Sequence, residues 1–206
     1  MVQILTINPD NPDPTVIRKA RTDILEGKLV IFPTDTVYGL AADPFNEKAV
    51  TALITAKKRD STKGFPILVA NLEIAKELVF FSSIASSIAS KFWPGALTLI
   101  LPLKKSVSNL VTGYRQTLGI RIPNHSIAQQ LAEIPIIGTS ANISGKKSPI
   151  TAEDAISQLG NSVDLVLNGG STKGDIPSTI IDLSEEPPKL LREGAIKWDQ
   201  LRPFLF

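Results

Sequence analysis

The chain has 206 residues, 43% of them hydrophobic, and its net charge at pH 7 is only +2. A chain of this length can bury roughly 70% of the surface that its unfolded form exposes, so it can build a core without disulfides or metals. It contains no cysteine and a single histidine, His125, which excludes thiolate metal sites and zinc sites made of several histidines. Bulk charge gives no indication of nucleic-acid or membrane binding. We expect a single domain spanning residues 1–206.

No targeting or membrane segment is expected. The start of the chain, MVQILTINPDNPDP, lacks the basic and long apolar regions of a signal peptide. The longest apolar run, residues 97–103, is far shorter than the ~20 residues needed to cross a bilayer. Together with the lack of cysteine, these features predict a soluble, cytoplasmic protein.

Amphipathic helices and short apolar strands alternate along the sequence. Helices are expected from Pro14 to about Gly27, from Asn46 to Lys57, after Asn71, through Ile84 to Phe92, from Ser126, and from Thr151 to Gly160. Strands are expected over residues 29–33, 66–70, 96–101, 118–122, 134–140, 163–168, 178–183 and 189–193. The aromatic residues between positions 198 and 206 are expected to pack back onto the body. This alternation favours a layered α/β fold with a mixed sheet.

Polar side chains follow the expected strand 29–33, in the segment PTDTVYGL from Pro33 to Leu40. Thr34, Asp35 and Thr36 offer short oxygen-bearing side chains at a strand end, which is where α/β folds place ligands. The same residue types are favoured in ordinary strand–helix turns, so both interpretations stay open.

Cations gather where the helix that starts at Asn46 is expected to end. Lys57, Lys58 and Arg59 are followed by Lys63, with Asp60 as the one acid among them. They indicate either a polyphosphate clamp, in which arginine binds oxygens through paired donors, or a solvated helix end whose dipole they stabilise. No GxxxxGK segment is present, which excludes a P-loop site.

Two further polar groups follow strands nearer the C-terminus. In GTSANISG, residues 138–145, Ser140 and Asn142 lie between glycines and either bind an anion or belong to a polar loop. Arg121 lies on an otherwise apolar strand, and burying its charge unpaired would be costly. Its partner is therefore either an anionic substrate or an internal Asp or Glu. His125 is expected in a loop or a helix cap.

In chain order, these segments resemble the motifs of the YrdC-type threonylcarbamoyl-AMP synthases of the YrdC/YciO/YwlC superfamily, in their single-domain form. The motifs are PTDTVYGL, AKKR with Lys63-Gly64, WPGALT, IRIPNH, GTSANISG, STIID and LLREG. The resemblance implies a twisted mixed sheet flanked by helices, α/β or in strict schemes α+β, around a large basic concave cleft. It also implies a nucleotidyltransferase that converts L-threonine, bicarbonate or CO2, and ATP into L-threonylcarbamoyl-AMP and pyrophosphate.

The resemblance further implies roles for individual residues. The catalytic set would be Lys57 and Arg59, from the Lys-x-Arg pair, and Ser140 and Asn142, from the Ser-x-Asn pair. These four would bind ATP together with Lys63, Thr98 and Arg192, while Thr34, Arg121 and Ser178 would bind L-threonine. Mg²⁺ would be carried with ATP, and no metal site of the protein's own is implied.

The implied product would serve threonylcarbamoyladenosine modification of tRNA, through downstream threonylcarbamoyl-transferase proteins. The alternative hypothesis is a YciO-like protein that binds double-stranded RNA or tRNA without synthase activity. YciO-like members lack parts of the Lys-x-Arg and Ser-x-Asn sets, and both sets are intact here, which favours the synthase. The small net charge and the lack of an aromatic-rich RNA-binding motif also argue against RNA binding as the main role.

Overall fold

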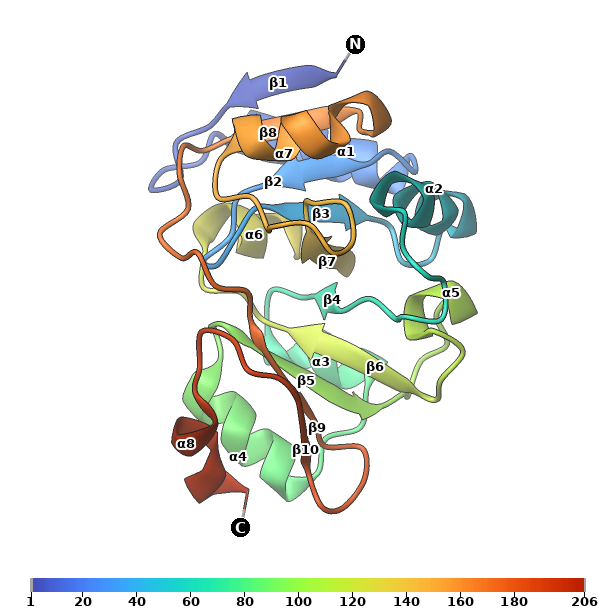
Figure 1. The fold of residues 1–206 in the computed structure, drawn as a ribbon, viewed down its shortest axis with the longest axis vertical. Coiled ribbons are helices and arrows are strands. Elements are labelled where there is room, and N and C mark those ends of the chain that lie inside the picture. The colour runs from blue at the N-terminus through green and yellow to red at the C-terminus, as the bar shows by residue number, and fades with distance from the viewer. Residues whose placement is uncertain (1, 206) are drawn as a thin grey trace.

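A computed structural model describes residues 2–205 of the chain. Its strands form one mixed sheet in the order β1-β8-β2-β3-β7-β4-β6-β5-β9-β10, with the two termini near opposite ends of the long axis (Figure 1). The strands are β1 Gln3–Thr6, β2 Val30–Phe32, β3 Gly39–Ala42, β4 Ile67–Leu68, β5 Leu97–Pro102, β6 Thr117–Arg121, β7 Ile136–Ser140, β8 Leu165–Asn168, β9 Thr179–Asp182 and β10 Lys189–Arg192. The helices are α1 Pro14–Leu25, α2 Glu47–Lys57, α3 Leu72–Leu78, α4 Ser83–Phe92, α5 Asn109–Thr112, α6 Ser126–Leu131, α7 Ala152–Leu159 and α8 Trp198–Leu201, with short 3-10 turns at Gly160–Ser162 and Arg202–Phe204.

Helix starts follow the capping residues read from the sequence. The side chains of Asn46, Asn71 and Thr151 accept hydrogen bonds from the first backbone N–H groups of α2, α3 and α7. Helix α1 ends just before Gly27, whose φ of 87° suits a residue without a side chain. The predicted α/β class and mixed sheet are confirmed.

Four of the helices and strands were not predicted. Strand β1 and helices α5 and α8 are four residues long, too short for a periodic pattern to identify them. Strand β3 follows the polar part of PTDTVYGL: its sequence, GLAA, is small and buried, and carries no alternation. The expected strand 66–70 shortens to the two residues of β4.

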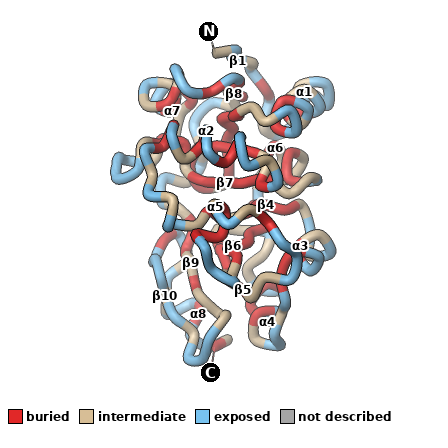
Figure 2. Tube along the Cα trace, turned by 90° about the vertical axis from the view of Figure 1, so that its right-hand side faces the viewer, coloured by how far each residue is buried: buried red, intermediate tan, exposed pale blue. Residues whose placement is uncertain are grey.

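Both faces of the N-terminal half of the sheet are covered by helices. Helices α1 and α6 pack on one face against Val30 and Phe32, while α2 and α7 contribute to the core on the other face, which includes Ile31. This switch of face between successive residues of β2 follows from the two-residue period of a strand. Figure 2 shows buried positions concentrated along these strands, with exposed positions along the outer sides of the helices.

The C-terminal half of the sheet uses one face for the core. Leu99 of β5, Ile120 of β6 and Ile181 of β9 are fully buried in the same core as residues of α3 and α4. Trp198 and Phe204 pack back onto the core as expected, with the ring of Phe204 set edge-on to Phe92 at 5.5 Å, and Phe206 lies outside the described residues. The opposite face of these strands carries the candidate site. Within residues 2–205, no helix has the length and apolar character of a membrane span.

Candidate active site

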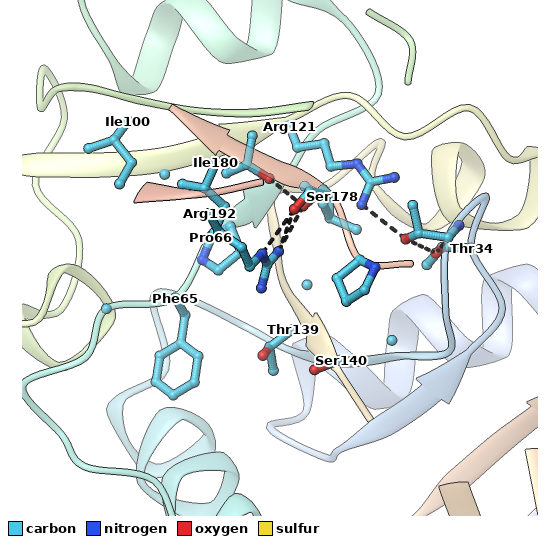
Figure 3. A pocket seen from close by; sticks show the side chains of 18 of the residues that line it. Thr34, Phe65, Pro66, Ile100, Arg121, Thr139, Ser140, Ser178, Ile180 and Arg192 are labelled. Atoms are coloured by element: carbon cyan, nitrogen blue, oxygen red, sulfur yellow. Dashed lines mark hydrogen bonds between the residues drawn. The ribbon is translucent and has the colours of Figure 1, made fainter. Parts of the chain in front are cut away.

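A cleft opens on the face of β5, β6 and β9 that turns away from α3 and α4. It encloses about 1050 Å³ of space, part of which is open solvent. Strand alternation explains its lining: Thr98, Ile100, Gly119, Arg121 and Ile180 point into it, while their neighbours along each strand enter the core. Strand β7 and the loop after β2 close the other side, so that Ser140 and Thr34 face the same space (Figure 3).

Arg121 forms an ion pair with an internal acid, Asp35. Its Nη2 donates to the Asp35 carboxylate at 2.6 Å, its Nη1 to the Thr36 hydroxyl at 3.3 Å and its Nε to the Gly95 carbonyl at 2.8 Å. Burial lowers the pKa of the guanidinium and Asp35 raises it. A guanidinium has five N–H donors, so two remain for a ligand in the cleft. The internal acid and the anionic ligand, left open as alternatives by the sequence, are therefore compatible.

Thr34 is held in a compact turn beside this pair. Its hydroxyl donates to the Val37 carbonyl at 2.7 Å and accepts from the Thr36 N–H at 3.0 Å. The two threonine hydroxyls are 3.0 Å apart. The polar half of PTDTVYGL is therefore a hydrogen-bonded loop that presents hydroxyl groups to the cleft and positions Asp35 against Arg121.

Ser178, Thr98 and Arg192 form a second polar group in the cleft lining. Figure 3 shows the hydrogen bonds between Ser178 and Arg192. The Ser178 and Thr98 hydroxyls are 2.9 Å apart. Arg192, on edge strand β10, donates from Nε and Nη2 to the Ser178 carbonyl at 3.0 and 2.7 Å, and from Nη2 to its hydroxyl at 3.2 Å. These bonds bring a residue implied to bind threonine and two implied to bind ATP into direct contact.

Arg59 enters the cleft just beyond the end of α2. Its guanidinium donates to the carbonyls of Lys63 and Gly64 and stacks over the Phe65 ring, 4.8 Å from the centroid. Burial lowers its pKa, while neighbouring Asp60 raises it. Lys63 itself is exposed and contributes only its backbone carbonyl to this arrangement.

The charged side chains that line the cleft are all positive. Arg59, Arg115, Arg121 and Arg192 all line it, and its lining within the described residues includes no Asp or Glu. The pKa of Arg192 is lowered mainly by burial, and the like charges of Arg121 and Arg59 lower it further. Three guanidinium groups that repel one another around an open space favour the binding of an anion there.

The four residues implied to be catalytic separate into two positions. Arg59 and Ser140 line the cleft, whereas Lys57 and Asn142 are buried behind its wall. Lys57 Nζ donates to the carbonyls of Ser140 and Asn142, and burial, followed by repulsion from Arg59, lowers its pKa to about 7. Asn142 Nδ2 donates to the carbonyls of Ile143 and Lys146.

Asp35 and Arg115 were not assigned roles from the sequence. Asp35 lies within the PTDTVYGL motif, and the buried charge of Arg121 was the signal that an acid was needed. Arg115 lies in the loop before β6 and carried no motif. His125 sits at the N-cap position of α6 without a side-chain capping bond, and burial lowers its pKa. Within residues 2–205, no group of three or more His, Cys, Asp or Glu could hold a metal ion.

Comparison with known proteins connects this site to a family. The sequence pattern of the Sua5/YciO/YrdC family, described as "Telomere recombination", matches residues 22–194. The threonylcarbamoyl-AMP synthase of Pyrococcus abyssi is 41% identical over 192 residues, which are 90% of this chain and 56% of the relative. That of Vibrio vulnificus is 35% identical over 82% of this chain and 93% of the relative. The chain therefore spans about half of the longer relative and nearly all of the shorter one.

Comparison with solved structures points to the same family. P. abyssi Sua5, determined as a complex with L-threonine, superposes with a TM-score of 0.93 at 38% identity, covering 98% of this chain and 60% of that one. E. coli YciO superposes with a TM-score of 0.89 at 29% identity, covering all of both chains. The match to the family's sequence pattern extends over most of the chain and includes the strands and loops that line the cleft. This chain belongs to the Sua5/YciO/YrdC family.

Proposed function

We propose that the protein is an L-threonylcarbamoyladenylate synthase, which joins L-threonine, bicarbonate or CO2, and ATP into L-threonylcarbamoyl-AMP and pyrophosphate. The observation that carries this proposal is a cleft lined by four arginines and several hydroxyl groups, with no carboxylate in its lining among the described residues. Such a lining suits a polyanionic substrate together with a small polar one. The similarity to synthases over most of the chain, including a threonine-bound Sua5, supports the same assignment.

The two substrates are assigned to adjoining parts of the cleft, which meet where Arg192 contacts Ser178. Arg121 has two N–H groups left after its internal bonds, and these are suited to the carboxylate of threonine. Thr34 and Ser178 offer hydroxyl groups on the same side. Arg59 and Arg192 are suited to the phosphates of ATP, because guanidinium groups bind phosphate oxygens through paired donors.

The chemistry requires positioning more than proton transfer by the protein. The threonine amine adds to CO2, forms an N–C bond and loses a proton to water, which gives a carbamate. A carbamate oxygen then attacks the α-phosphorus of ATP, and the bond from that phosphorus to the bridging oxygen breaks and releases pyrophosphate. Arg59, Arg192 and Ser140 would offset the negative charge that builds up on the phosphates in the transition state. A cleft without a catalytic histidine or cysteine is sufficient for this reaction.

Mg²⁺ enters this proposal with ATP. The cleft lining includes no carboxylate among the described residues, so the protein supplies no anionic ligand for the ion there. Phosphate oxygens and water would hold it, as is common for Mg²⁺ bound with nucleotides. When bound, it would neutralise phosphate charge alongside the arginines.

The product fits a role in tRNA modification. An acyl-adenylate is an activated donor, and a separate transferase would pass the threonylcarbamoyl group to an adenosine of tRNA. We place this role in the cytoplasm. Direct binding of tRNA or double-stranded RNA, without synthesis, is the competing outcome of the test below.

The test measures pyrophosphate release from purified protein with ATP, Mg²⁺, L-threonine and bicarbonate, and identifies threonylcarbamoyl-AMP by mass spectrometry. We expect release only when both threonine and bicarbonate are present, and at least ten-fold less release with L-serine, because the hydrophobic contact of the threonine methyl group is lost. Pyrophosphate release without threonine would indicate simple hydrolysis of ATP to AMP and pyrophosphate. No release, combined with salt-sensitive binding of double-stranded RNA, would overturn the proposal in favour of the RNA-binding alternative.

A further inference from the structure

The last residue of α2, Lys57, is 1% exposed and does not line the cleft. Its Nζ donates to the backbone carbonyl of Asn142 at 2.8 Å and to that of Ser140 at 2.5 Å. No carboxylate within the described residues pairs with it, although seven ion pairs occur elsewhere there. A buried amine that is bonded only to backbone carbonyls holds a loop in place.

The same loop is tied to α2 a second time. The Ser144 N–H donates to the backbone carbonyl of Lys57 at 2.8 Å. Side chain and main chain of Lys57 therefore bond to three positions in five consecutive residues of the loop. At the start of this loop, Ser140 is the last residue of β7 and lines the cleft (Figure 3).

We propose that Lys57 is a positioning residue that acts on the reaction through Ser140, by fixing the Ser140–Ser144 backbone to the end of α2, and that it does not contact the phosphates. The proposal rests on the synthase function and gives the lysine of the Lys-x-Arg pair a different role from that of its arginine. Arg59 faces the substrates, and Lys57 supports the wall opposite it.

The chain geometry explains this separation. Lys58 adopts a left-handed conformation, with φ of 48° and ψ of 44°, and ends the helix. The chain reverses there, so the side chain of Lys57 stays on the inner side of α2 while that of Arg59 passes into the cleft. The Ser-x-Asn pair separates in the same way: Ser140 faces the cleft, and Asn142 is 6% exposed and bonds to its own loop.

The number of hydrogen-bond donors also matches the role. Burial lowers the pKa of Lys57 to about 7, so near neutral pH much of the amine is uncharged. A neutral amine still has two N–H groups, and the two carbonyl acceptors need two. Positioning of the loop therefore survives the loss of the charge, whereas attraction to phosphate does not.

A double-mutant cycle tests the proposal. Lys57→Met keeps the side-chain volume and removes the donors, and we expect it to lower kcat about 10²-fold, as misplacement of a reacting group does. Ser140→Ala should lower kcat by about 10² to 10³-fold, as loss of a transition-state donor does. If Lys57 acts through Ser140, adding Lys57→Met to Ser140→Ala lowers kcat by no more than about three-fold further. Losses that multiply, or a rise in the ATP Kd caused by Lys57→Met in both backgrounds, would overturn the proposal.

Two further measurements keep the result independent of activity and folding. Hydrogen exchange of the ligand-free protein should show at least ten-fold faster exchange in peptides covering residues 138–146 of Lys57→Met, with α1 and α6 unchanged; unchanged exchange in the loop would contradict the role. Lys57→Gln keeps two N–H donors without the charge, and should recover at least ten-fold in kcat over Lys57→Met. Equal losses in the two variants would point to the charge instead.

Lys48→Met serves as the matched control, because it removes an exposed lysine from the same helix and should change neither exchange nor kcat. The synthase function and the positioning role of Lys57 would be contradicted by different results. Absence of threonine-dependent pyrophosphate release by the wild-type protein would remove the synthase function, whereas the exchange experiment tests the loop contact by itself.

Discussion

At the scale of single residues, the site depends on a buried ion pair more than on exposed ones. The side chains of Arg121 and Asp35 are 8% and 13% exposed, and the pair is extended by bonds to Thr36 and Gly95. Removing one partner of such a pair leaves the other charge buried and uncompensated. Surface pairs on this chain, such as Lys189 with Glu185, are solvated and contribute little.

Asp35→Asn should therefore destabilise the protein while leaving its shape intact. We expect the free energy of unfolding to fall by about 3 kcal/mol, the range for breaking a buried pair from one side. Urea denaturation followed by circular dichroism measures this. Glu185→Gln, at the exposed pair, is the control and should change the free energy by less than about 0.5 kcal/mol. Equal effects of the two substitutions would mean that Asp35 is not the counter-charge of Arg121.

Arg121 also shows how far the sequence can be read at this scale. A charge on an apolar strand predicted the need for a partner, and the structure supplies one. The identity of the partner could not be predicted, because Asp35 lies 86 positions away and reaches Arg121 only through the order of the strands in the sheet. The ATP-binding role of Lys57 came from the resemblance to the Lys-x-Arg pair, and a motif does not indicate on which side of the helix end a side chain lies.

At the scale of elements, a connecting segment packs against the loop that carries Thr34. Residues 169–177, the strap, run from β8 to the cleft residue Ser178, and Gly174 lies against the backbone of Asp35 and Thr36. The Tyr38 hydroxyl donates to the Gly170 carbonyl at 2.6 Å and accepts from the Gly169 N–H at 3.2 Å. The strap is thus bonded to the residue that immediately precedes β3.

The approach of the strap is closest at Gly174. A Cβ there would lie 2.8 Å from the Asp35 carbonyl oxygen and 3.0 Å from the Thr36 Cα, which are backbone atoms that cannot rotate away. Gly174→Ala should therefore displace the strap or the Thr34–Thr36 loop, and we expect the KM for threonine to rise about ten-fold with the KM for ATP nearly unchanged. Steady-state kinetics with each substrate varied in turn measure both values.

The exposed Asp175 of the same strap provides the control for this experiment. Asp175→Ala should leave both KM values within about two-fold of wild type, as surface substitutions away from a site usually do. If Gly174→Ala changed the KM for ATP instead, the assignment of this end of the cleft to threonine would be wrong.

Elements differ in how well their sequences predict them. Helices α1, α2, α3 and α7 combine an apolar stripe with a capping residue, and these two signals agree on where each helix starts. Strands β1, β3 and β4 have two to four residues, and the sheet contacts that define them come from distant segments. Pairing of β3 with β7 places Gly39 opposite Ser140, a contact that no local pattern reveals.

At the scale of the whole molecule, the distribution of charge matters more than its sum. The net charge of +2 gave no indication of an anionic ligand. The fold nevertheless gathers four arginines around one cleft, from the end of α2, the loop before β6, β6 itself and edge strand β10. Composition cannot report such clustering, since exposed acids elsewhere on the surface offset it. Only the ordered motifs indicated that these residues act together.

Arg115 provides the test of this cluster, because it is an exposed residue of the cleft lining whose side chain makes no hydrogen bond or ion pair with the described residues. Arg115→Ala should weaken ATP binding about ten-fold at about 0.1 M salt, the value of one charged hydrogen bond. At about 1 M salt, where the Debye length falls to ~3 Å, the difference should shrink below about three-fold. Threonine binding should be unaffected.

Arg18→Ala, at an exposed position on α1, removes the same charge and should alter the affinity for neither ATP nor threonine. Calorimetry at both salt concentrations measures the dissociation constants. Equal weakening of ATP binding by Arg115→Ala and Arg18→Ala would mean that net charge, and not the cleft, attracts the nucleotide.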